Sequence, residues 1–224
     1  MADNTKTRRI IKRNLKKHGF IPQNDGLKSH KISYENGWGK ITFSFGKYHD
    51  KFLFNILRRI NGIDDDWDHF AKKLNLNNPK ESFTIVTHIQ SVGKHFDEYN
   101  EFVEPFNNTD KLLRDSNKFD EAFSNVMENC ISPFLIKVGD LTVLNNLMNN
   151  PLDKWENIHD IIAGGTSVYF KKVLLAYKVG YEQKENIEYF VKDVFNEKLN
   201  VKGSKEKYKL YMNTLDEIIN FYKN

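Results

Sequence analysis

The chain has 224 residues, of which 39% are hydrophobic and 29% charged, and this ordinary globular composition excludes disorder over most of the sequence. No run approaches the roughly 18 apolar residues that a membrane-spanning helix needs, and the Arg and Lys residues among the first twenty argue against a secretory signal. We therefore expect a cytoplasmic protein with no membrane partner. The single cysteine, Cys130, excludes an intramolecular disulfide and a cysteine-rich zinc site, and we expect it to be a buried, inert thiol.

Residues 4–18 predict an amphipathic helix that ends at Gly19, where a left-handed residue is wanted, and Pro22 stops further helix. Placing successive residues 100° apart puts an apolar set on one side: Thr7, Ile10, Ile11, Leu15 and His18. The basic residues fall on the other side: Lys6, Arg8, Arg9, Lys12, Arg13, Lys16 and Lys17.

This basic face is the most distinctive feature of the sequence. Residues 1–20 contain seven Lys or Arg and one Asp, a formal charge of +6, and because the whole chain is +4, residues 21–224 sum to −2. Such a face binds phosphates or an acidic protein surface, whereas its narrow apolar side, without Trp or Phe, argues against a membrane. The alternative is a solvated face whose Lys and Arg side chains form ion pairs with acidic neighbours in this protein. The candidate binding residues are Arg8, Arg9, Lys12, Arg13, Lys16 and Lys17.

A β-hairpin is predicted next. Apolar and polar residues alternate around Ile32 and Tyr34 and again from Ile41 to Phe45, and the segment Asn36-Gly37-Trp38-Gly39 between them supplies residues suited to a tight connection.

The segment 51–60 is ambiguous, because its apolar residues fit both a strand and a helix, and we favour a helix that ends at Asn61-Gly62. A short helix over 64–74, with an acidic first turn, and a third strand around residues 83–89 follow.

From Gly93 onward only helical periodicity remains, in about 119–131, 141–148, 166–179, 184–199 and 205–222. The predicted fold class is therefore α+β, with an N-terminal basic helix packed on a small antiparallel sheet of about three strands and followed by a C-terminal helical half. We predict one packed unit over 1–224, with an α+β sub-region at 1–92 and a helical sub-region at 93–224.

Three segments suggest chemistry, and each has a simpler interpretation. The run Asp64-Asp65-Asp66-Trp67-Asp68-His69 could bind a hard cation, but consecutive helical residues point in different directions, so we interpret it as an acidic helix start. His88 and His95 could converge across a turn, with Asp97 or Glu98 as an acid–base partner for a hydrolase.

The third segment is Ala163-Gly164-Gly165-Thr166-Ser167, which could bind an anion but lacks the lysine of a P-loop, so we interpret it as an interhelical turn capped by Thr166 or Ser167. No recognisable catalytic, metal or cofactor motif is present in the sequence, so we expect no cofactor, no metal site and no catalytic residue.

Parts of the chain resemble a known family. The pieces are residues 10–20, with the sequence IIKRNLKKHGF, residues 41–46, with ITFSFG, and, more remotely, residues 131–135, with ISPFL. They are similar to the uncharacterised bacterial family called domain of unknown function 4304. The resemblance implies a helix that ends in a His-Gly-Phe turn, then a sheet and a helical tail, and it carries no activity.

We expect a non-enzymatic intracellular bacterial protein-binding module, in a toxin-neutralising (immunity) or phage-defence accessory role. The alternatives are a nucleic-acid-binding protein that uses the basic helix, and a hydrolase centred on His88 and His95.

Overall fold

The computed structural model describes residues 4–24, 29–45, 52–74, 82–150, 161–162, 165–199, 201 and 203–224. The chain divides into two compact units. Unit 1 comprises Met1–Arg58 and Ile85–Gly139, and unit 2 comprises Arg59–Thr84 and Asp140–Asn224. The borders of the units therefore differ from the predicted division between residues 92 and 93, and the packing of 1–224 into one body stays a prediction.

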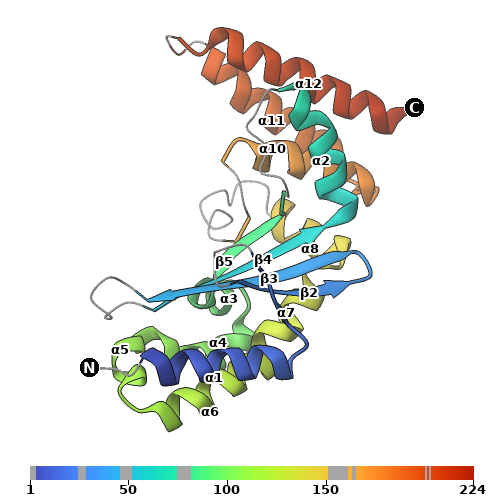
Figure 1. The fold of residues 1–224 in the computed structure, drawn as a ribbon. Helices are drawn as coiled ribbons and strands as arrows, with labels where there is room; N and C mark the ends of the chain where they lie inside the picture. Colours follow the sequence, from blue (N-terminus) through green and yellow to red (C-terminus); the bar gives the residue numbers. More distant parts are fainter. Residues whose placement is uncertain are drawn as a thin grey trace. The chain divides into compact units, whose positions relative to one another are not determined.

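An antiparallel five-stranded sheet forms the centre of unit 1, with the strands in chain order from β1 to β5 (Figure 1). The strands are β1 (Ile21–Pro22), β2 (Ser29–Tyr34), β3 (Gly37–Phe45), β4 (Phe52–Ile60) and β5 (Ile85–His88). The α+β class is thus confirmed, but the sheet has two strands more than the three predicted. One is the very short β1, and the other is β4.

The predicted helix at 51–60 is wrong, because residues 52–60 form the interior strand β4. Its Phe54, Ile56 and Ile60 are buried, whereas Leu53 is exposed. β4 forms backbone hydrogen bonds with β3 on one side and β5 on the other. This pairing outweighs the helical preference that the spacing of Leu53, Leu57 and Ile60 indicates.

The hairpin of β2 and β3 is confirmed, with a tighter connection than predicted. Tyr34 pairs with Gly37, so only two residues connect the strands, and Gly37 has a φ of 137°. Trp38 and Gly39 belong to β3 rather than to the turn. A Cβ atom on Gly39 would lie 3.1 Å from the Tyr34 ring, so the close approach of that ring requires glycine here.

A buried arginine fastens this hairpin to the rest of unit 1. Arg58 is 1% exposed, its Nε donates to the carbonyl oxygen of Leu135 at 3.1 Å, and its guanidinium lies 4.3 Å from the centre of the Tyr34 ring. A second guanidinium nitrogen donates to Asn36 Oδ1, and Asn36 Nδ2 donates to the Gly139 carbonyl oxygen at 2.7 Å. These bonds satisfy donors that would be costly to bury alone.

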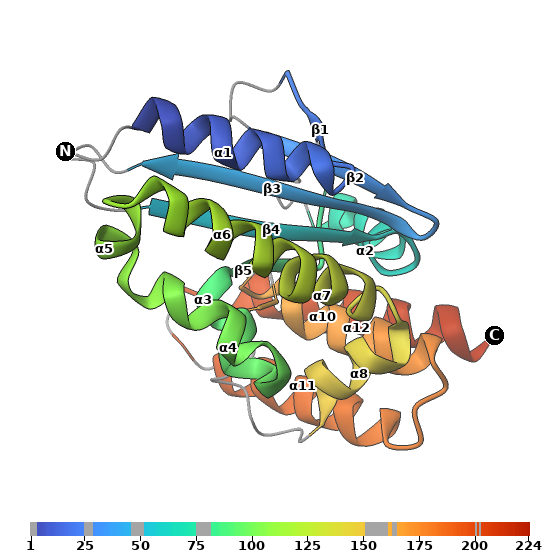
Figure 2. The ribbon, with the colours of Figure 1, turned by 90° about the horizontal axis from the view of Figure 1, so that it is seen from below.

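The first helix, α1 (Asn4–Lys17), has the predicted apolar side. Ile10, Ile11 and Leu15 are buried, and Thr7 is 2% exposed. The helix ends as predicted, because Gly19 has a φ of 81° and its N–H donates to the Lys16 carbonyl oxygen. α1 lies beside α6 (Ser116–Val126) on one face of the sheet (Figure 2).

The remaining helices of unit 1 are short. They are α3 (Ile89–His95), η1 (Asp97–Tyr99), α4 (Asn100–Val103), η2 (Glu104–Asn108), α5 (Thr109–Leu113), the π-helical segment η3 (Met127–Ile131) and α7 (Ser132–Lys137). The predicted third strand ends at His88, and α3 begins directly after it.

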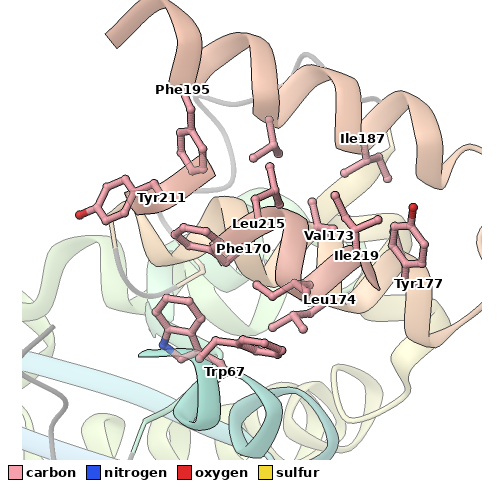
Figure 3. Packing of buried hydrophobic residues seen from close by; sticks show 14 of the residues in the cluster. Trp67, Phe170, Val173, Leu174, Tyr177, Ile187, Phe195, Tyr211, Leu215 and Ile219 are labelled. Atoms are coloured by element: carbon pink, nitrogen blue, oxygen red, sulfur yellow. The ribbon is translucent and has the colours of Figure 1, made fainter. Parts of the chain in front are cut away.

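Unit 2 is helical. Among its described residues the helices are α2 (Asn61–Lys73), α8 (Leu141–Asn149), α10 (Ser167–Lys178), α11 (Lys184–Leu199) and α12 (Lys205–Lys223), and they confirm the helices predicted in these regions. Aromatic side chains fill the core between them (Figure 3). The rings of Trp67 and Phe170 stack with centroids 5.2 Å apart, and Phe195 and Tyr211 pack on Phe170 at 5.3 and 5.7 Å.

A buried ion pair joins α2 to α10 within unit 2. The Asp64 carboxylate is 0% exposed and receives the Lys171 ammonium at 2.8 Å. The same carboxylate accepts hydrogen bonds from the backbone N–H of Ile60, from Ser82 Oγ and from Thr84 Oγ1. These partners replace the water that the buried Asp64 carboxylate loses on folding.

We expect Asp64→Ala to lower the free energy of unfolding by about 3–5 kcal/mol, because it leaves the Lys171 charge buried without its carboxylate. Urea denaturation followed by Trp fluorescence, which reports on the buried Trp67, measures this loss. The matched control is Lys178→Ala, which removes the partly exposed pair with Asp66. A loss below about 1 kcal/mol for Asp64→Ala, comparable with a surface pair, would contradict the prediction.

Candidate binding surface on the first helix

Three cations of α1 form a row on its exposed side. Arg9, Lys12 and Lys16 occupy positions i, i+3 and i+7, which share one side of a helix, and all three are exposed. Within the described part of the chain none of them forms an ion pair. The row rises by about 10.5 Å from its first to its last residue, at about 1.5 Å per residue. We call these three residues the basic row.

The other predicted cations of α1 already have partners. Arg13 forms an ion pair with Asp120 of α6, and Lys17 lies 3.8 Å from Glu128 of η3. Arg8 lies over the Phe45 ring, with 5.4 Å to its centroid. The predicted face is thus divided into paired residues at its flanks and the basic row at its centre.

Asp120 connects α1 to α6 by more than charge. Asn14, which is 3% exposed, donates from Nδ2 to Asp120 Oδ1 at 3.1 Å and to the Ile10 carbonyl oxygen at 3.1 Å. The hydrogen bond from Arg13, together with that from Asn14, lowers the pKa of the Asp120 carboxyl below its ordinary value. Asp120 therefore remains charged over the neutral range and fixes the position of Arg13.

The carboxylates of the acidic run at residues 64–69 point to different partners, as the sequence predicted. Arg59 binds both Asp65 and Asp68, and Asp66 pairs with a lysine of α10. Among the residues that the structure describes, no group of three His, Cys, Asp or Glu side chains is placed to hold a metal ion. The run therefore stabilises unit 2 through ion pairs.

The site hypothesised at His88 and His95 lies around α3, and it stays a prediction. His88 precedes α3 and His95 is its last residue, so the turn expected between them is a helix. The seven residues of that helix rise by about 10 Å between the two histidines. Nearby, Glu98 forms an ion pair with Lys137 rather than with either histidine.

The turn before α10 is only partly described, because Ala163 and Gly164 lie outside the described residues. Gly165 has a φ of 52°, and Thr166 precedes the helix without a capping hydrogen bond from its side chain. The predicted interhelical turn is thus present, and Thr166 occupies the capping position without acting as a side-chain cap.

Comparisons with known proteins provide no further assignment. No protein-family model matches the chain, and no curated protein or solved structure does either. No helix in the described ranges is both long and apolar enough to cross a membrane.

The sequence could locate the cations of α1 but not their partners. Asp120 and Glu128 lie more than a hundred residues away along the chain, and no local pattern connects them to α1. Asp120 and Glu121 lie in the middle of α6 and have no particular spacing to the basic helix, so they gave no signal of this contact.

The thiol of Cys130 is buried as predicted, and burial raises its pKa to about 12. We expect no reaction with Ellman's reagent in the native protein at pH 8, because the reactive thiolate is absent and the sulfur is inaccessible. Addition of guanidinium chloride should release one thiol per chain. Rapid reaction of the native protein would contradict this assignment and would mark Cys130 as a functional thiol.

Proposed function

We propose that this protein is a non-enzymatic protein-binding module that contacts an acidic protein surface through the basic row of α1. The main support for this proposal is the division of charge on α1. The flanking cations have partners, whereas Arg9, Lys12 and Lys16 form no ion pair within the described residues. An exposed cation without an ion pair can attract an anionic ligand.

The surroundings of the basic row favour a protein over a nucleic acid. Asp120 of α6 and Glu128 of η3 pair with Arg13 and Lys17, so the charge of α1 that forms no ion pair within the described residues is confined to a narrow row. The sequence of α1 contains no aromatic residue on which an unpaired base could stack. A narrow positive row with an acidic border matches a folded protein that presents its own carboxylates in a line.

The expected immunity or phage-defence role and the similarity to the uncharacterised bacterial family stay predictions. So does the nucleic-acid alternative, and one titration distinguishes it from protein binding.

The test is a titration of fluorescently labelled poly-L-glutamate, duplex DNA and RNA with the wild type and with Arg9→Gln/Lys12→Gln/Lys16→Gln. We expect binding of polyglutamate to weaken roughly 3- to 150-fold in the triple variant, since each of the three exposed ion pairs contributes about 0.2–1 kcal/mol. Fluorescence anisotropy measures the dissociation constants.

The matched control changes three exposed lysines elsewhere, Lys72→Gln/Lys111→Gln/Lys205→Gln, and so alters the net charge equally. Equal losses in both triple variants would show a net-charge effect and would contradict a site on α1. Tighter binding to DNA or RNA, with a salt dependence that falls by about one unit per lost phosphate contact, would favour the nucleic-acid alternative.

A variant that is expected to strengthen binding tests the same surface. Asp120→Asn keeps an acceptor for Asn14 but removes the charge that holds Arg13. We expect polyglutamate to bind several-fold more tightly, because Arg13 then adds a fourth cation beside the basic row, while thermal stability falls slightly. Unchanged or weaker binding in a folded Asp120→Asn protein would show that Arg13 does not adjoin the binding surface.

A further inference from the structure

A second row of charge, opposite in sign to the basic row, lies on α11. Glu185, Tyr189 and Asp193 follow one another at intervals of four residues, so they lie along one side of this helix. All three are exposed, and Tyr189, at 74%, is the most exposed large hydrophobic residue in the described part of the chain. Within the described residues neither Glu185 nor Asp193 forms an ion pair. We call these three residues the acidic row.

The acidic carboxylates next to this row are used differently. Glu188 accepts a hydrogen bond from Tyr177 at 2.7 Å and pairs with Lys192 at 2.8 Å. Lys192 also pairs with Asp216 of α12 at 3.0 Å. These residues hold the helices of unit 2 together, whereas the acidic row makes no comparable contact. The same separation of paired from unpaired charge therefore occurs on α11 as on α1.

The dimensions of the two rows agree. Arg9 and Lys16 are seven residues apart, about 10.5 Å along their helix, and Glu185 and Asp193 are eight residues apart, about 12 Å. Two helices that lie side by side can therefore bring both outer pairs into contact at once. The middle positions then place the Lys12 ammonium against the Tyr189 ring, a cation–π arrangement.

We propose that the basic row of one copy binds the acidic row of a second copy, so that the protein self-associates head to tail. This inference rests on the proposed function, since it names the partner of the basic row. Charge complementarity supports a second copy: the excess charge of residues 1–20 is +6, the rest of the chain is −2, and both rows are present in every molecule. Because the two surfaces differ, the contact is heterologous and each added copy leaves one free row of each kind.

The test uses two neutralised variants. The first, Arg9→Gln/Lys12→Gln/Lys16→Gln, lacks the basic row, and the second, Glu185→Gln/Asp193→Asn, lacks the acidic row. In sedimentation velocity at low salt, we expect the weight-average mass of the wild type to rise with concentration, and each variant alone to remain monomeric. An equimolar mixture retains one intact contact and should form a 1:1 complex that grows no further.

Salt should reduce the association of the wild type, because exposed pairs are screened. Tyr189→Ala should weaken it roughly two- to fivefold, in keeping with a cation–π contact at an exposed site. A wild type that stays monomeric, or a mixture of the two variants that forms no complex, would overturn the proposal. Growth of the mixture beyond 1:1 would also do so, since a third surface would then be required.

The controls separate this inference from the proposed function. Glu101→Gln/Glu104→Gln removes the same negative charge from exposed residues of unit 1 and should associate as the wild type does. The variant without the acidic row keeps an intact basic row, so it should still bind polyglutamate. If it binds polyglutamate while the wild type does not self-associate, self-association is refuted and the proposed function stands. If polyglutamate binding also fails to depend on the basic row, both are refuted.

Discussion

The Asp64 carboxylate is the interaction on which unit 2 depends. It lies without solvent contact at the start of α2, and it receives a lysine ammonium, two hydroxyl groups and a backbone N–H. A buried charge is tolerated only when the protein replaces its lost hydration. One carboxylate therefore holds the segment at residues 82–84, the start of α2 and the middle of α10. The aromatic core packs between the same two helices and their neighbours.

Other charged residues in the described part of the chain follow the same rule. Arg58 and Arg59 are consecutive in β4, yet each forms bonds within its own unit. Arg58 binds the Leu135 carbonyl oxygen and an asparagine, and Arg59 binds carboxylates. Arg13 and Lys192 are likewise committed. The basic row of α1 and the acidic row of α11 form no ion pair within the described residues, and the proposed contacts use these side chains.

Local patterns were sufficient where an element is shaped by its own sequence. The ends of α1 and the span of α12 followed from glycine positions and apolar spacing, and the burial of Ile10, Ile11 and Leu15 followed from the helical period. Local patterns failed for β4, because its conformation is decided by two neighbouring strands. They also could not show that Arg13 contacts Asp120, because the two residues are 107 positions apart. The cations were therefore predicted as one basic face, whereas the structure pairs those at its edges with other residues.

The interleaving of the two units along the chain has a consequence for biosynthesis. A ribosome that has reached Gly139 has made every residue of unit 1, whereas unit 2 then consists of the single segment Arg59–Thr84. Lys171, the ion-pair partner of Asp64, is synthesised 107 residues after it. The other residues of α10, on which Trp67 and Phe70 of α2 pack, are synthesised equally late. At about 5–20 residues per second, this interval lasts from five to some twenty seconds. During it the nascent chain exposes a charged and aromatic helix that lacks its partners, which is the kind of surface that ribosome-associated chaperones shield.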